Sequence, residues 1–175
     1  MSFAQIDKLA PTSLPQPVCF PFQKQVREEL VSKLNSFSPK SVWEFLPTGH
    51  ASIGPNYRAL MGPDVSSACE LSLAEESGEL LLSFFNLDLL RMDQLYMFFS
   101  EARRVVKREG LLIIVGVAAP RSLLEKLATT FWCYSKKRKI FRVDHYISPE
   151  DWVEIERLSV PANSIRSEIL ILKRI

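Results

Sequence analysis

The chain has 175 residues, of which 47% are hydrophobic and 24% are charged. This length corresponds to one domain with a buried core, and the composition excludes a disordered segment, a collagen-like fibre and a disulfide-stapled miniprotein. Lysine and arginine number 22 against 20 acidic residues, so the net charge of +2 gives nucleic acid no strongly basic surface to bind.

Three further features favour a cytoplasmic protein that is not attached to a membrane. The three cysteines are widely spaced and match neither a disulfide framework nor a metal-binding motif, which favours reducing surroundings. No apolar run approaches the roughly 20 residues that cross a bilayer. The N-terminal sequence also lacks the basic and then apolar stretches of a secretory signal.

The first segment of the chain is rich in proline. Residues 1–21 contain four prolines and few regularly spaced apolar positions. Because proline removes a backbone donor and fixes φ, this segment forms neither a helix nor an inner strand. We predict an extended N-terminal arm over residues 1–21 and a single domain over residues 22–175.

The next segments predict a helix followed by short elements. Apolar residues at intervals of four, four and three predict an amphipathic helix over residues 23–37. Residues 41–46 and 65–71 have the apolar, bounded pattern of strands. A Gly-Pro pair predicts a short helix over residues 54–61, with proline at its first position.

The middle of the chain carries the strongest strand patterns. Residues 79–85 (ELLLSFF) and 111–117 (LLIIVGV) are dense apolar runs, which are typical of strands buried on both faces of a parallel sheet. Between them, apolar spacing predicts a helix that begins near Asp93 and ends in basic residues before Gly110. Pro120 opens another helix, with three leucines and Phe131 on one side.

The last forty residues combine two patterns. Residues 148–151 (SPED) are typical of a helix start, whereas Val153 and Ile155 alternate as in a strand. We predict a short turn at 148–151 and then two antiparallel strands over 153–159 and 167–174. The order of strands and helices predicts an α/β sheet with crossover helices.

The central segment resembles class I S-adenosylmethionine (SAM)-dependent methyltransferases. Residues 79–117 are similar to the family's fourth strand, fourth helix and fifth strand, with ARRVVKREG where the family turns into its fifth strand. The closing segment through 169–173 is similar to its antiparallel last strands. The resemblance implies a reduced Rossmann-like sheet, mostly parallel, with an antiparallel C-terminal pair. Only residues 71–78 separate Glu70 from the next predicted strand, which predicts that one βα unit is missing after the second strand.

The resemblance also assigns candidate cofactor ligands. In the family, an acidic residue at the end of the first strand precedes a glycine-rich loop, and a second acidic residue binds the ribose. Glu44 and Glu70 match the acidic positions, and Thr48 and Gly49 lie in the loop. Asn86 stands where amino-methylating members hold the substrate nitrogen, although it is also suited to capping the next helix.

The loop departs from the family pattern. Its three glycine positions hold Leu46, Thr48 and His50, and Gly49 is out of register by one residue. Glycine allows the main chain to approach a ligand closely, so these side chains occupy space that a nucleoside needs. We therefore predict an eroded, non-catalytic methyltransferase-like domain without a cofactor, acting as a protein-interaction or scaffold module. The alternative is an active SAM-dependent methyltransferase of unknown substrate.

The remaining polar and apolar groups identify no catalytic or metal site. The two histidines, His50 and His145, have no ligand spacing. Residues 136–139 are four consecutive basic residues, which suit an acidic partner, a phosphate or simple solvation. The apolar cluster at 95–99 exceeds what one helix face needs, which predicts cover by the N-terminal arm or another subunit. We therefore expect a protein partner or self-association.

Overall fold

A computed structural model gives the structure of the chain. It describes residues 21–40, 42–46, 58–61, 71, 73–136, 140, 142–162 and 164–175. The predicted N-terminal arm lies outside the described residues except for Pro21, at which the first helix begins.

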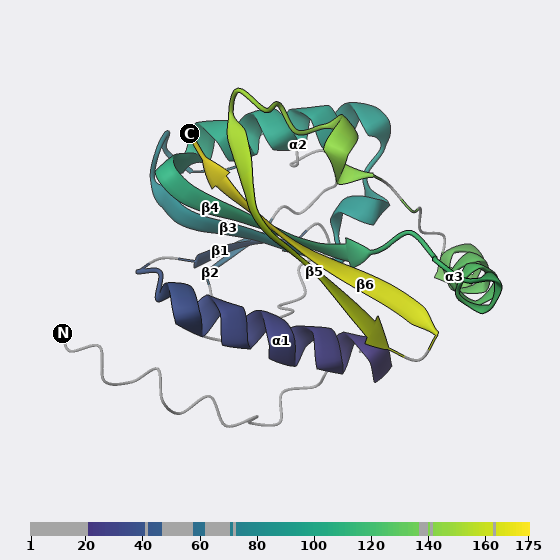
Figure 1. Cartoon of the computed structure of the whole chain (residues 1–175). Helices are drawn as coiled ribbons and strands as arrows, with labels where there is room; N and C mark the ends of the chain where they lie inside the picture. The colour runs from purple at the N-terminus through teal and green to yellow at the C-terminus, as the bar shows by residue number, and fades with distance from the viewer. Residues whose placement is uncertain are drawn as a thin grey trace.

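The described residues form a six-stranded sheet with the order β2-β1-β3-β4-β6-β5 (Figure 1). The strands are β1 (Val42–Leu46), β2 (Arg58–Met61), β3 (Gly78–Phe84), β4 (Val106–Val117), β5 (Trp152–Ala162) and β6 (Ile165–Arg174). The helices are α1 (Pro21–Phe37), α2 (Met92–Val105) and α3 (Leu123–Lys136), with 3-10 turns η3 (Leu87–Leu89) and η4 (Val143–His145).

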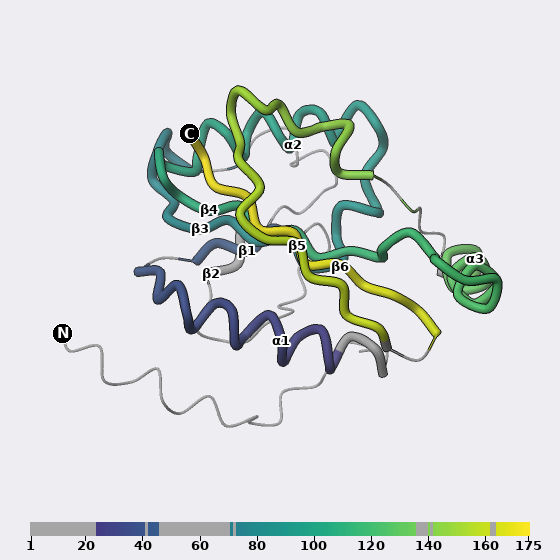
Figure 2. The backbone as a smooth tube through the Cα atoms, in the orientation of Figure 1, coloured from purple at the N-terminus to yellow at the C-terminus, as the bar shows by residue number. Residues whose placement is uncertain are grey.

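The predicted fold class is confirmed. Strands β2, β1, β3 and β4 are parallel, whereas β6 is antiparallel to both β4 and β5. Figure 2 traces the chain from β3 through α2 into β4 and then through β5 to β6, which lies between β4 and β5. Among the described residues, β2 is an edge strand and the next strand in the chain is β3, as expected if one βα unit is missing.

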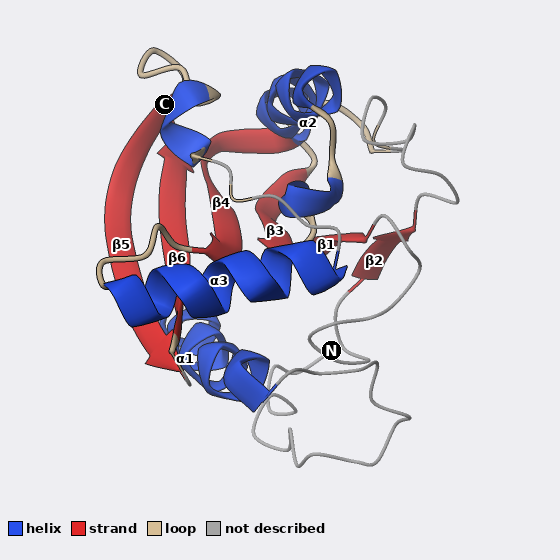
Figure 3. Cartoon of the chain, turned by 90° about the vertical axis from the view of Figure 1, so that its right-hand side faces the viewer, coloured by secondary structure: helices blue, strands red, loops and turns tan. Residues whose placement is uncertain are grey.

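The core lies on both faces of the sheet, because β3 and β4 are buried on both sides. Leu80 and Ile113 pack in the cluster on the α1 face, whereas Leu81 and Leu112 pack in the cluster on the α2 face. Helix α1 buries apolar residues spaced by four, and α2 buries its apolar stripe against the opposite face (Figure 3). The predicted helix over 23–37 and the predicted strands over 41–46, 79–85 and 111–117 are confirmed.

The short helix predicted over 54–61 is wrong over residues 58–61, which form β2, and residues 54–57 lie outside the described residues. This strand pairs in parallel with β1, with Phe45 opposite Leu60. Four residues carry no helical period of their own, and pairing with the open edge of β1 satisfies their backbone groups. The strand predicted over 65–71 lies outside the described residues except for Leu71, which is not in a strand.

The predicted end of the second long helix is also wrong. Helix α2 ends at Val105, and the next residues already belong to β4. The β3–β4 ladder shifts register between Gly78 and Leu80, so β4 takes up additional residues there, and Glu109 has φ 65°. A Cβ at Gly110 would lie 2.8 Å from the Lys107 carbonyl oxygen. Gly110 therefore permits this irregularity rather than ending a helix.

The C-terminal prediction is confirmed and the strands extend further than expected. Residues 149–151 form a turn in which the backbone N–H of Trp152 donates to the Ser148 carbonyl at 3.0 Å. Strands β5 and β6 follow as a hairpin.

Candidate functional site

The carboxyl ends of β1 and β3 form the topological switch point of the sheet. The chain passes from β1 to β2 in one direction and from β3 to β4 in the other. In open α/β sheets, ligands bind in the crevice outside the strand ends at such a point. Among the described residues, those that lie at this point are the last residues of β1 and the segment that follows β3.

Asn86 ties these two strand ends together. Its side-chain Nδ2 donates to the Phe45 carbonyl at 2.8 Å, and the residue is only 8% exposed. The preceding Phe85 has φ 52°, and its N–H donates to the Val115 carbonyl at 2.8 Å, which aims Asn86 back toward β1. The amide nitrogen of Asn86 therefore already holds a backbone partner across the switch point.

Glu44 lies within β1 rather than at its end. It pairs in register with Ala59 and Leu82 and is 1% exposed. Its neighbours Trp43 and Phe45 face the α2 cluster, so the alternation of a strand directs Glu44 to the α1 face. The described arrangement therefore places this carboxylate on the α1 face of the sheet, and its role as a cofactor ligand stays a prediction.

The other predicted cofactor residues, Thr48, Gly49 and Glu70, lie outside the described residues. The strand that adjoins β1 ends at Met61, and Glu70 comes nine positions later in the sequence. The first carboxylate in the sequence after that strand is Asp64.

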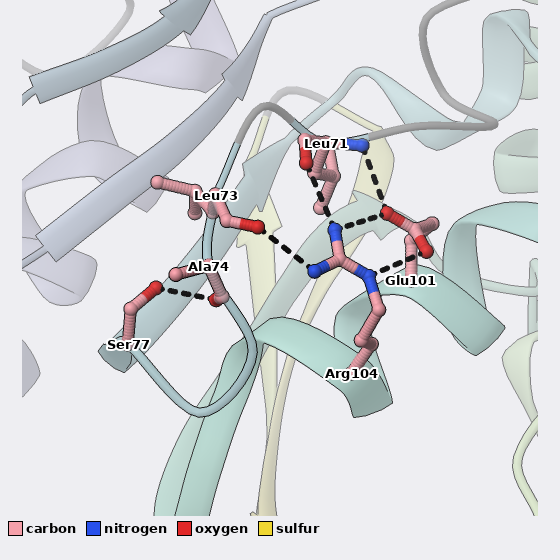
Figure 4. A network of polar contacts seen from close by, with 6 residues as sticks. All are labelled: Leu71, Leu73, Ala74, Ser77, Glu101 and Arg104. Carbon is pink, nitrogen blue, oxygen red and sulfur yellow. Dashed lines mark hydrogen bonds and ion pairs between the residues drawn. The ribbon is translucent and has the colours of Figure 1, made fainter.

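A charged network that sequence reasoning missed anchors the segment leading into β3 (Figure 4). Arg104 on α2 donates to the carbonyls of Leu73 at 2.8 Å and Leu71 at 2.9 Å. Glu101 pairs with Arg104 at 2.7 Å and accepts from the Leu71 N–H at 2.9 Å. The hydrogen bond from Arg104 lowers the pKa of Glu101. Both charged side chains bind backbone groups of Leu71 or Leu73, so this network fixes the segment that leads into β3 against α2.

A second charged cluster lies beside the end of β4. Arg157 pairs with Asp144 at 2.6 Å, Glu154 at 2.7 Å and Glu168 at 3.1 Å. Its hydrogen bonds, chiefly to Glu154, raise the pKa of Arg157. The neighbouring cavity of about 150 Å³ is lined by Val117, Ala118, Ala119, Ile140, Arg142, Val143, Asp144, Arg157 and Glu168.

Another cavity, of about 170 Å³, lies between α2 and the segment before β5. It is lined by Tyr96, Phe99, Ser100, Arg103, Tyr146, Ser148, Asp151 and Trp152. Both cavities are smaller than the roughly 300 Å³ of a small ligand site. Neither lies at the switch point, and His145 is an exposed residue of η4. Within the described ranges, no group of three or more metal-ligating side chains occurs, and no helix is long and apolar enough to span a membrane.

Helix α3 has an outward apolar face that the sequence did not reveal. The predicted helix is confirmed, but the side that carries its leucines and Phe131 is exposed rather than packed on the sheet. The exposed fractions are Leu123 79%, Leu124 75%, Leu127 69%, Phe131 74% and Tyr134 86%. The opposite side buries Thr129 and Trp132. In the sequence, α3 carries apolar residues on two sides of the helix, whereas a helix on the surface of a monomer needs only one apolar side.

Comparison with solved structures identifies the fold. The N-methyltransferase NodS from Bradyrhizobium japonicum WM9, solved with S-adenosyl-L-homocysteine, is similar over 93% of both chains, with 16% identity and a TM-score of 0.64. Geranyl diphosphate C-methyltransferase from Streptomyces coelicolor A3(2) is similar over 87% of this chain and 79% of that chain, with 9% identity and a TM-score of 0.62. Magnesium protoporphyrin IX methyltransferase from Synechocystis PCC 6803 is similar over 88% of this chain and 84% of that chain, with 10% identity and a TM-score of 0.61.

No protein-family model and no curated protein matches the sequence. The chain therefore has a methyltransferase-like, Rossmann-like fold, as its resemblance to class I SAM-dependent methyltransferases implies.

Proposed function

We propose that this chain is a non-catalytic, methyltransferase-like module that binds another protein chain through the outward face of α3. The observation that carries the proposal is the set of apolar side chains on α3 that are 69–86% exposed. Fully burying a leucine or phenylalanine side chain stabilises a complex by about 1.5–3 kcal/mol. A contiguous apolar patch of this kind marks an interaction surface on a folded protein.

The arrangement at the switch point supports the non-catalytic part of the proposal. The support comes from the two candidate SAM ligands that lie in the described part of the chain. Glu44 is buried inside β1, and the Asn86 amide nitrogen donates to the Phe45 carbonyl. Releasing Asn86 to hold a ligand would leave a buried carbonyl without its donor, which costs about 1–3 kcal/mol.

Ligand titration tests this part. Thermal unfolding is measured with about 1 mM SAM or S-adenosylhomocysteine, at which a site of about 10 µM affinity would add about 2.7 kcal/mol. We expect the melting temperature to stay unchanged with either compound. A rise with both compounds, together with saturable heat in calorimetry, would overturn the non-catalytic assignment.

The alternative is an active SAM-dependent methyltransferase, and the overall similarity to NodS favours it. NodS is an N-methyltransferase that was solved with S-adenosyl-L-homocysteine bound. If this chain binds SAM, a carboxylate after β2 holds the ribose. Asp64→Asn and Glu70→Gln are then the informative pair of variants. Loss of binding in one variant and its retention in the other would identify that carboxylate.

A further inference from the structure

We infer that the protein chain covering α3 is a second copy of this chain, paired helix against helix and antiparallel about a two-fold axis. This inference rests on the proposed function, because it assigns an occupant to the same face. It would make the protein a symmetric dimer in which each α3 supplies half of the interface.

The spacing of the outward residues fits a helix pair. Leu124, Leu127, Phe131 and Tyr134 follow one another at intervals of three, four and three. This is the spacing of the a and d positions of a heptad, which form the seam between two packed helices. All four side chains are exposed in the described structure, so no other part of the described chain occupies the seam.

The same spacing is complementary to itself. An interval order of three, four and three is unchanged by reversal, so an antiparallel copy centred on the middle of the stripe places apolar residues opposite apolar residues. Leu127 then lies opposite Phe131 of the partner subunit, and Leu124 opposite Tyr134 of the partner subunit. Each contact joins a leucine to an aromatic ring, and an isologous interface of this kind closes after two copies.

The size of the face agrees with a dimer of modest affinity. Phe131 and Tyr134 carry about 150–250 Å² each, and each leucine about 100 Å². With the exposed fractions given above, the stripe offers roughly 500 Å² per copy, and a symmetric pair buries roughly 1,000 Å². That area is the lower limit of specific interfaces, so we expect a reversible, concentration-dependent dimer.

The helix macrodipole selects the antiparallel orientation. A parallel pair would bring together the two C-terminal ends of α3, which both carry partial negative charge, whereas an antiparallel pair separates them by the length of the helix. It also places the C-terminal end of each α3 beside the N-terminal turn of the partner, where the helix dipole is positive.

Sedimentation equilibrium of the full-length chain over roughly 5–500 µM tests the inference, because association follows mass action. We expect a monomer–dimer equilibrium that Phe131→Glu weakens by at least about tenfold. Met92→Glu is the matched control, since Met92 is an apolar residue 67% exposed on α2, and it should leave association unchanged. A chain that stays monomeric, or a dimer that Phe131→Glu does not weaken, overturns the inference.

Mixtures of variants test the orientation. Leu127→Glu and Phe131→Lys should each abolish self-association, and their mixture should form a heterodimer because the introduced charges face each other in the antiparallel pair. Leu127→Glu mixed with Leu127→Lys is the control, because only a parallel pair places position 127 opposite itself. Association of the control mixture alone overturns the antiparallel arrangement.

Other occupants give different results. If the chain is a monomer that binds the apolar dye ANS, the α3 face is open and suits a different protein. If the chain is a monomer that does not bind ANS, the α3 face is covered by its own chain. Both results overturn the second-copy occupant. SAM binding would overturn the proposed function whatever the oligomeric state, whereas a monomer without SAM binding would overturn only this inference.

Discussion

Helices α2 and α3 present the same type of sequence pattern but opposite environments. Both are 14 residues long and carry apolar residues at helical spacing. The apolar stripe of α2 packs against the sheet, where Phe98 is fully buried. The outer stripe of α3 faces away from the molecule, where Phe131 is 74% exposed.

The difference follows from what each helix covers. Helix α2 crosses between the parallel neighbours β3 and β4, so its position over the sheet is set by the crossover. Helix α3 contacts the sheet with Trp132 and is fixed to β6 by the Arg166–Glu125 pair at 2.7 Å. An apolar stripe at helical spacing therefore does not by itself show which face of a helix packs against the sheet.

The largest effect is expected from a substitution in the buried apolar stripe of α2. Phe98→Ala removes a fully buried ring that packs 4.8 Å from the Phe45 ring, centroid to centroid. We expect a loss of about 3–5 kcal/mol of unfolding free energy, since the cavity adds to the lost transfer energy. Urea denaturation measures it. Phe131→Ala is the matched control, and at low protein concentration it should cost no more than about 0.5 kcal/mol.

A smaller effect is expected from the polar contact at the switch point. Asn86→Ala removes the donor that satisfies the Phe45 carbonyl, in a buried position. We expect the unfolding free energy to fall by about 1–3 kcal/mol because an acceptor is left unsatisfied. Urea denaturation at constant pH measures it. A neutral result would mean that water or another donor replaces the amide, and that the strand ends are open to ligands.

The Glu101–Arg104 pair, which holds the segment leading into β3, predicts a pH-dependent effect on stability. Glu101→Gln removes the charge that pairs with Arg104, and should cost about 1–2 kcal/mol at pH 7. Arg104 holds the pKa of Glu101 below its ordinary 4.5, so the stabilisation is complete above that pH and is lost as pH falls through the lowered value.

Wild type and Glu101→Gln should therefore converge in stability as pH falls through the lowered pKa of Glu101. Denaturation midpoints measured across this range provide the check. A constant difference between the two proteins at every pH would contradict the role of this charge.

The smallest effect concerns the exposed stripe itself. Leu127→Gln should change the unfolding free energy of the dilute monomer by less than about 0.5 kcal/mol, because the side chain is mostly exposed. At high concentration the same variant should be less stable than wild type, because only the wild type gains from association. Thermal unfolding at two protein concentrations separates these contributions. Equal behaviour at both concentrations would contradict a role for Leu127 in the interface.

Much of the fold could be predicted from the sequence. Strands β3 and β4 are dense apolar runs that require cover on both faces, and α1 repeats Val26, Leu30 and Leu34 at intervals of four. Strand β2 could not be predicted, because its four residues owe their conformation to pairing with β1 rather than to any pattern of their own. The sequence does not distinguish a helix end from a β-irregularity at Gly110, because both use glycine for the same conformational reason.

The candidate site was predictable only in part. The position of Asn86 directly after β3 follows from the sequence, but its hydrogen bond to Phe45 depends on the backbone twist at Phe85. Glu44 is predicted from the resemblance to be a cofactor ligand and is buried on the α1 face of β1, and its ligand role stays a prediction. Thr48, Gly49 and Glu70 remain predictions.

Hydrogen exchange at low and high protein concentration tests the central claim most directly, because it compares α2 and α3 in one experiment. The account predicts that backbone amides of α3 exchange more slowly at high concentration, while those of α2 exchange at the same rate at both. Exchange in α3 that does not depend on concentration would contradict the assignment of its outward face to a second copy of the chain.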